Sequence, residues 1–168
     1  MENYFETIIV GAGPAGLIAG KYLKDALILD EKKEIGRPIQ CIGISMKSLE
    51  RQGLKPDSSW AKSTINKIER VMPNGKILGK TKEPFAYVVE KSSFEKFLSK
   101  DIKAKLMLNQ KVSDMFLKDN SWNIKTLNGN FFKSKYIIAA DGFNSVVRKF
   151  LLPEFKNGIE LAFGLEYV

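Results

Sequence analysis

The sequence contains no histidine, and Cys41 is its single cysteine. Without histidine, these 168 residues cannot supply a Ser-His triad, a histidine general base or an ordinary zinc site, so no metal site is predicted. A lone cysteine cannot form an internal disulfide, which fits a reducing compartment and predicts a cytoplasmic location. Any redox chemistry must therefore come from a bound cofactor.

Long apolar runs and dense basic clusters are also missing. No apolar stretch approaches the roughly 18 residues of a membrane span, and the acidic start of the chain lacks the basic region of a signal peptide. Basic residues outnumber acidic ones 27 to 19, a net charge of +8 that favours anionic partners such as nucleotide cofactors or phospholipid headgroups. The basic residues are scattered and not interleaved with aromatic residues, so nucleic acid is not predicted as a partner.

A strand, a helix and a second strand are predicted at the start of the chain. Residues 5–10 form a short β-branched and apolar run, and residues 14–24 place apolar side chains along one wide stripe of a helix. Residues 26–30 form a second apolar run. This β-α-β order predicts a buried parallel sheet in an α/β fold.

The turn between the first strand and the helix is glycine-rich, with the sequence Gly11-Ala12-Gly13-Pro14-Ala15-Gly16. Gly11 allows a tight turn, Gly13 lets a pyrophosphate approach the backbone, and Gly16 lets the helix pack closely on the strand. The helix N-terminus offers N–H groups and a positive dipole end to phosphates. The segment predicts a dinucleotide site, with a merely compact turn as the alternative. The predicted cofactor contacts are Gly11, Gly13, Pro14, Ala15 and Gly16.

Two acidic residues, Asp30 and Glu31, end the second strand. The acid that binds a ribose is expected about twenty residues after the start of the glycine motif, which fits Glu31. Either carboxylate could bind the ribose hydroxyls, and an exposed acid without a ligand is the alternative.

The remaining elements are predicted from periodicity and turn residues. Residues 32–45 are expected to form a loop. The Asn-Gly pair of Pro73-Asn74-Gly75 predicts a hairpin between two short runs within 65–78. Ser92 or Ser93 is expected to cap a helix. Helices are predicted at 46–53, 92–104 and 145–152, and strands or extended runs at 85–89, 106–108, 112–118, 122–127, 131–132, 136–140 and 159–168.

Two runs near the start of the chain carry a family resemblance. Ile8-Ile-Val-Gly-Ala-Gly-Pro-Ala-Gly-Leu17, followed by Asp30-Glu-Lys-Lys-Glu-Ile-Gly-Arg-Pro-Ile-Gln-Cys41, resembles the geranylgeranyl reductase family, within the wider p-hydroxybenzoate hydroxylase-like flavoproteins. The resemblance implies FAD as cofactor and favours Glu31 over Asp30 as the ribose ligand. It also implies cofactor contacts in the same run from Lys32, Arg37 and Cys41, with Cys41 beside the flavin as a candidate proton donor. A small buried cysteine is the alternative.

Two further segments are similar to the same family. In Tyr87-Val-Val-Glu-Lys-Ser-Ser-Phe94, Lys91 stands where the family has an arginine that reaches the FAD pyrophosphate. Lysine keeps the positive charge but lacks the bidentate fork. Tyr136-Ile-Ile-Ala-Ala-Asp-Gly-Phe-Asn-Ser145 resembles the second flavin signature of the group, which implies cofactor contacts from Asp141, Gly142 and Ser145. Val112 matches a position whose backbone meets adenine.

The resemblance implies a Rossmann-like FAD-binding domain over residues 1–155, with a β-meander insertion at about 42–90. Residues 156–168 are expected to begin a substrate domain that is otherwise missing. The implied activity is reduction of carbon–carbon double bonds in prenyl or geranylgeranyl chains by hydride from reduced FAD. A prenyl lipid, reached at a membrane surface, and an electron donor such as NAD(P)H or ferredoxin are the expected partners. An FAD-dependent aromatic-ring monooxygenase and an inactive FAD-binding fragment are the alternatives.

Overall fold

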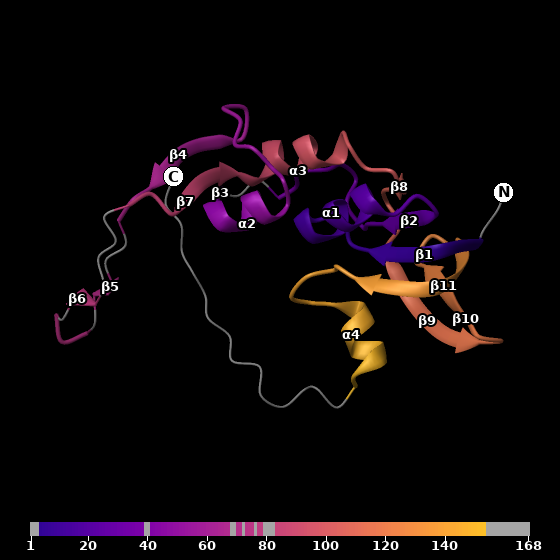
Figure 1. Ribbon diagram of the computed structural model, residues 1–168. Coiled ribbons are helices and arrows are strands. Elements are labelled where there is room, and N and C mark those ends of the chain that lie inside the picture. Colours follow the sequence, from indigo (N-terminus) through magenta and orange to yellow (C-terminus); the bar gives the residue numbers. More distant parts are fainter. Residues whose placement is uncertain are drawn as a thin grey trace. The chain divides into compact units, whose positions relative to one another are not determined.

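The computed structural model describes residues 4–38, 41–67, 70–71, 73–75, 77–78 and 83–153 (Figure 1). The chain divides into two compact units. The first consists of Met1–Arg37 together with Glu95–Val168, and the second of Pro38–Phe94. The expected insertion at about 42–90 lies inside the second unit.

A six-stranded sheet with the order β8-β2-β1-β11-β10-β9 forms the first unit. Its strands are β1 (Tyr4–Val10), β2 (Ala26–Leu29), β8 (Lys105–Met107), β9 (Val112–Lys118), β10 (Ser121–Thr126) and β11 (Phe131–Ala139). The neighbours β8, β2, β1 and β11 pair in parallel, whereas β11, β10 and β9 pair antiparallel. The strand order reverses at β1, as in doubly wound folds. The predicted Rossmann-like parallel sheet is therefore confirmed.

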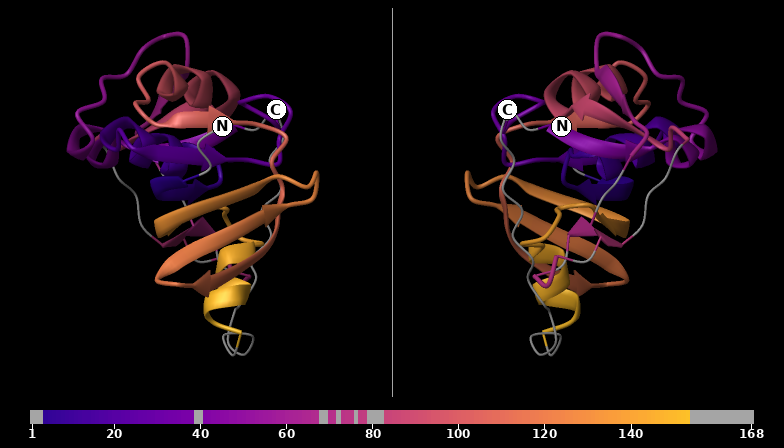
Figure 2. Two further views of the ribbon diagram at one scale, coloured as in Figure 1. Left: turned by 90° about the vertical axis from the view of Figure 1, so that its right-hand side faces the viewer. Right: turned by 90° about the vertical axis from the view of Figure 1, so that its left-hand side faces the viewer.

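Two helices cover the sheet of the first unit: α1 (Pro14–Tyr22) and α4 (Val146–Leu151). A Cβ added to Gly20 of α1 would lie 2.6 Å from Cδ1 of Ile28, so α1 packs on the face of β2 that carries Ile28. Because side chains alternate along a strand, Leu27 and Leu29 point to the other face. There they join an apolar cluster with Val147 of α4, and Figure 2 shows α4 beside β9. The buried cluster consists of Ile8, Val10, Leu27, Leu29, Val112, Met115, Ile124, Phe132 and Val147.

The second unit contains a three-stranded antiparallel sheet with the order β3-β7-β4. Its elements are β3 (Cys41–Ser45), α2 (Met46–Arg51), β4 (Ala61–Ile65) and β7 (Ala86–Glu90). Trp60 and Phe94 are buried, with ring centroids 4.8 Å apart. The hairpin predicted around Gly75 is confirmed, because β5 (Arg70–Val71) pairs antiparallel with β6 (Ile77–Leu78). Helix α3 (Lys91–Ser99) continues from β7 into the first unit.

Several predicted boundaries were wrong. Residues 41–45, expected in a loop, form β3 because they pair with β7, a contact distant in sequence. The two strands expected at 131–132 and 136–140 are one strand, since residues 131–134 pair with β10 while residues 133–139 pair with β1. The helix expected at 92–104 begins at Lys91 and ends at Ser99.

The strand expected at 159–168 and the domain start expected at 156–168 lie outside the described residues. No helix in the described part of the chain is long and apolar enough to cross a membrane.

Candidate functional site

The carboxyl ends of β1, β2 and β11 meet at one edge of the six-stranded sheet. The Gly11 N–H, just after β1, donates to the Leu29 carbonyl of β2 at 2.7 Å. The Ala140 N–H, just after β11, donates to the Val10 carbonyl at 2.8 Å. In doubly wound sheets, ligands bind outside this edge at the point where the strand order reverses. Here that point lies between β1 and β11.

The three glycines of the turn after β1 meet different constraints. Gly11 has φ +104°, and a Cβ there would overlap the Ala140 carbonyl oxygen. A Cβ on Gly16 would overlap the Gly11 carbonyl oxygen. Gly13 has an ordinary φ of −77°, and its Cβ would meet no atom within 4 Å. The fold itself therefore requires Gly11 and Gly16, whereas Gly13 keeps open the space that a pyrophosphate would need.

Helix α1 begins at this open space. Gly13 is its N-cap and Pro14 its first residue, and within the described residues no side chain caps the helix. The N–H groups in the first turn of a helix lack intrahelical partners and carry the positive end of its dipole. The start of α1 therefore fits the phosphates of a dinucleotide.

The two acids after β2 differ in their exposure to solvent. Asp30 is buried, and its carboxylate accepts the Ala12 N–H at 2.5 Å and the Lys32 N–H at 2.8 Å. The Glu31 side chain is 62% exposed and lies 2.8 Å from the ammonium of Lys111. Asp30 thus ties the glycine-rich turn to β2, while Glu31 remains accessible to the hydroxyls of a ribose.

The loop after β2 is held by a buried carboxylate on α3. Glu95 is fully buried, and its Oε2 accepts the Gly36 N–H at 3.1 Å. The same oxygen lies 3.5 Å from the Lys32 ammonium, which is also 3.8 Å from Asp30. The ammonium of Lys32, predicted as a cofactor contact, is therefore directed toward two carboxylates of the chain.

A second, exposed ion pair lies further along this loop. The Arg37 Nε donates to the Glu34 carboxylate at 2.5 Å. This hydrogen bond and the guanidinium charge lower the pKa of Glu34 below its ordinary value. Arg37 is 58% exposed in its side chain, so its guanidinium remains accessible to solvent.

The segment after β11 builds the start of α4. Asp141 Oδ2 accepts the Val146 N–H at 2.6 Å and the Val147 N–H at 3.1 Å, and Ser145 Oγ accepts the Arg148 N–H at 2.9 Å. Asp141 Oδ1 is buried and has no hydrogen-bond partner among the described residues. Gly142 has φ +73°, a conformation that glycine adopts without strain. The Arg148 guanidinium donates to the backbone carbonyl of Phe143 in this segment at 2.9 Å.

Three other predicted contacts belong to strands β9 and β3 and to helix α3. Val112, in β9, is 5% exposed and its side chain belongs to the apolar cluster. Cys41 is the first residue of β3, where it pairs in register with Glu90. Lys91 is the first residue of α3. Cys41 and Lys91 belong to the second unit and the other predicted contacts to the first.

Contrary to the prediction, neither Ser92 nor Ser93 is the residue before the helix, because α3 begins at Lys91. Ser92 and Ser93 lie inside the first turn of α3, and both hydroxyls donate to the Glu90 carboxylate at 3.1 Å. These hydrogen bonds, with that of Lys62, lower the pKa of Glu90. The two serines therefore fix the side chain of Glu90, the residue that precedes the helix.

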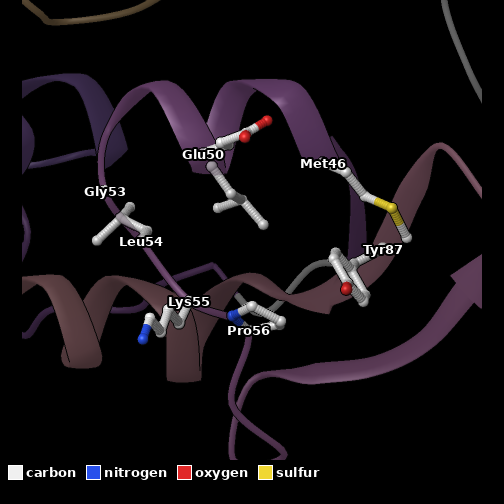
Figure 3. Close-up of a pocket in the computed structure, with 8 residues that line it drawn as sticks. Met46, Glu50, Gly53, Leu54, Lys55, Pro56 and Tyr87 are labelled. Carbon is white, nitrogen blue, oxygen red and sulfur yellow. The ribbon is translucent and has the colours of Figure 1, made fainter.

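The second unit also contains a cavity of about 360 Å³ between α2, the turn that follows it and β7 (Figure 3). It is lined by Met46, Leu49, Glu50, Gly53, Leu54, Lys55, Pro56 and Tyr87. None of the predicted cofactor contacts lines this cavity. The described residues contain no group of three or more His, Cys, Asp or Glu side chains that could hold a metal ion.

Two residues of this region were not identified from the sequence: Lys111, which pairs with the predicted ribose acid Glu31, and Glu95, which contacts the following residue, Lys32. Glu95 lies between buried Phe94 and exposed Lys96, and a lone glutamate in a helix is expected to be exposed. Its spacing of three residues from buried Leu98 places it on the buried helix face, a signal that could have identified it. Lys111 gives no comparable signal, because its partner Glu31 is distant in sequence.

Comparisons with known proteins identify the family of the chain. The family model described as FAD binding domain matches residues 4–160. The chain is 31% identical to a digeranylgeranylglycerophospholipid reductase of Methanococcus vannielii, covering 99% of this chain and 46% of the relative. It is 30% identical to digeranylgeranylglycerophospholipid reductase 1 of Methanothermobacter thermautotrophicus, covering 89% of this chain and 42% of the relative. The chain thus spans less than half the length of these relatives.

Solved structures extend the comparison. A geranylgeranyl bacteriochlorophyll reductase-like protein of Thermoplasma acidophilum is 25% identical, with a TM-score of 0.70 over 85% of this chain and 40% of that protein. The p-nitrophenol 4-monooxygenase PnpA of Pseudomonas putida is 18% identical, with a TM-score of 0.68 over 90% of this chain and 44% of that protein. At that identity the second likeness concerns the fold alone.

Proposed function

The chain belongs to the FAD binding domain family, and from this premise we propose that the protein reduces carbon–carbon double bonds of prenyl chains with FAD as its cofactor. The observation that carries the proposal is the identity of 31% to an archaeal digeranylgeranylglycerophospholipid reductase over 99% of this chain. The substrate class follows from that relative's name: a lipid with unsaturated prenyl chains. The protein reduces this lipid at a membrane surface, with electrons from an electron donor.

An aromatic-ring monooxygenase is the rival activity. Monooxygenases with the same fold share only 14–18% of their residues with this chain, and a shared fold does not specify a reaction. The run Glu34-Ile-Gly-Arg-Pro-Ile-Gln-Cys41, which resembles the reductases, favours prenyl reduction.

The residues of the first unit divide the binding of FAD among them. The first turn of α1, with Gly13 at its start, holds the pyrophosphate, because the space at Gly13 is open and no side chain caps the helix in the described part of the chain. Glu31, exposed at the end of β2, accepts hydrogen bonds from the adenosine ribose hydroxyls. The segment from Asp141 through Gly142 to Ser145 borders the same edge of the sheet.

Four further residues complete the proposed set of contacts. Lys91 and Arg37 supply positive charge toward the pyrophosphate, and the backbone of Val112 meets adenine. When bound and reduced, the flavin supplies the hydride for one carbon of the double bond. The Cys41 thiol donates the proton to the other carbon, so that the bond gains two hydrogens and the thiolate is reprotonated from water.

The test is an anaerobic assay of the complete gene product with chemically reduced flavin and a geranylgeranyl lipid. We expect mass spectrometry to show that the prenyl double bonds become saturated. When air is admitted, we expect no oxygen atom to be incorporated into the product. Oxygen consumption with hydroxylation of an aromatic substrate would support the monooxygenase instead. Bound FAD with neither reaction would overturn prenyl reduction while leaving the cofactor in place.

The variant Cys41→Ala tests the proton donor in the same assay. We expect normal flavin content, read from absorbance at roughly 450 nm, together with slower prenyl reduction. Unaltered turnover would remove Cys41 from the reaction.

A further inference from the structure

We infer that Glu95 is a positioning residue, which holds Glu31 toward the adenosine ribose by anchoring the loop after β2. The inference rests on the FAD site proposed above. Glu95 lies on α3, more than sixty residues after the acid that it would position. Glu31, Glu95 and the residues that connect them all belong to the first unit.

The loop after β2 is fixed at two points by one buried oxygen. Glu95 is 0% exposed, and its Oε2 accepts the Gly36 N–H at 3.1 Å. The same Oε2 lies 3.5 Å from the Lys32 ammonium. These contacts hold the residue directly after Glu31 and a residue further along the same loop. A buried carboxylate with a backbone partner and a cation is well suited to fix a loop in one geometry.

The exposures of three consecutive residues show what this anchoring does to Glu31. The Asp30 side chain is 6% exposed and that of Lys32 is 22% exposed, while that of Glu31 is 62% exposed. Both neighbours are directed inward, so Glu31 is directed outward. If Lys32 lost its inward partner, the loop could rotate and carry Glu31 away from the ribose.

The same contacts couple the ribose acid to the pyrophosphate turn. Lys32 donates its N–H to Asp30 Oδ1 at 2.8 Å, and Asp30 Oδ2 accepts the Ala12 N–H at 2.5 Å. The hydrogen bonds and ion pairs thus run from Ala12 through Asp30 and Lys32 to Glu95 without a gap. One network therefore orients the two parts of the chain that would bind the two ends of adenosine diphosphate.

The experiment compares the dissociation constants of ADP and 2′-deoxy-ADP for the 168-residue chain by isothermal titration calorimetry. A hydrogen bond from a ribose hydroxyl to a carboxylate makes 2′-deoxy-ADP bind about tenfold more weakly to the wild type. We expect Glu31→Gln to reduce this ratio to less than about threefold. Glu95→Gln keeps an acceptor for the Gly36 N–H but loses the ion pair, and we expect the same fall in the ratio.

The ratio separates positioning from general stability, because a loss of folded protein weakens the binding of both nucleotides alike. Lys32→Met removes the other end of the ion pair and decides the question if Glu95→Gln does not fold. Asp101→Asn changes an exposed acid just after α3 and serves as the matched control, with the wild-type ratio expected.

Two results would overturn the inference in different ways. A tenfold ratio retained in both Glu95→Gln and Lys32→Met would remove Glu95 as a positioning residue and leave the FAD site intact. A wild-type ratio near one would remove Glu31 as the ribose ligand and with it the inference. Failure of the wild type to bind either FAD or ADP would instead contradict the proposed function.

Discussion

Glycine serves two purposes in the turn between β1 and α1, and they can be separated by substitution. Gly13→Val places a side chain in open space and in an ordinary backbone conformation, so the fold should be retained. The branched side chain would occupy the proposed position of the pyrophosphate, and we expect FAD affinity to fall at least about a hundredfold. Flavin fluorescence titration measures the affinity, and circular dichroism measures the fold.

Gly16→Ala is the matched control within the same turn. Its Cβ would overlap the Gly11 carbonyl oxygen, so α1 must shift away from β1. We expect a loss of about 1–3 kcal/mol in the free energy of unfolding, read from urea denaturation. Unchanged FAD affinity in Gly13→Val would show that this space is not the pyrophosphate site.

The glycine motif and the acid at the end of β2 could be predicted because their residue types and spacing are local. The choice between Asp30 and Glu31 could not be made from spacing, since it depends on contacts of Asp30 with Ala12 and of its backbone with Met107. For Glu95 the spacing from Leu98 could indicate a buried position, but its partners Lys32 and Gly36 could not be predicted because they are distant in sequence.

At the scale of elements, α1 and α4 both begin at the same sheet edge, but they differ in whether side chains accept the N–H groups of their first turns. In α4, Asp141 and Ser145 accept the first three N–H groups. No side chain within the described residues does this for α1. The N-terminus of α4 is therefore satisfied by the chain itself, and that of α1 is the one that suits a phosphate.

Asp141 is therefore expected to contribute to stability even without cofactor. Asp141→Ala removes the acceptor for two N–H groups of α4, and we expect a loss of about 1–2 kcal/mol in the free energy of unfolding of the apoprotein. Ser145→Ala removes one acceptor and should cost less, about 1 kcal/mol. Urea denaturation of both variants measures the difference. If the Asp141→Ala apoprotein were as stable as the wild type, the role of the carboxylate would be limited to ligand binding.

Elements were predictable where their pattern is complete in one segment, as for β1, α1 and the hairpin around Gly75. They were not predictable where a strand depends on its partners. Lys133 and Lys135 interrupt the apolar pattern of β11, yet the strand continues because β10 pairs with its first half and β1 with its second. Strand β3 follows a segment rich in glycine and proline, and its own sequence does not indicate that it pairs with β7.

At the scale of the whole molecule, the net charge of +8 gives the chain a field that attracts an anionic cofactor. Charge alone does not distinguish FAD from other anionic cofactors. FAD is identified by the family match, which covers residues 4–160 and so includes parts of both units.

A cofactor that binds the folded chain must also stabilise it. At a free FAD concentration about one hundred times its dissociation constant, the stabilisation is about 2.7 kcal/mol. For a chain of this size that corresponds to a rise in the melting temperature of about 5–10 °C. Circular dichroism melts of the apoprotein with and without FAD measure the shift. Gly13→Val should melt near the wild-type apoprotein and show no shift, because its fold is retained while the pyrophosphate space is filled. A wild-type melting temperature that does not change with FAD would contradict cofactor binding by these 168 residues.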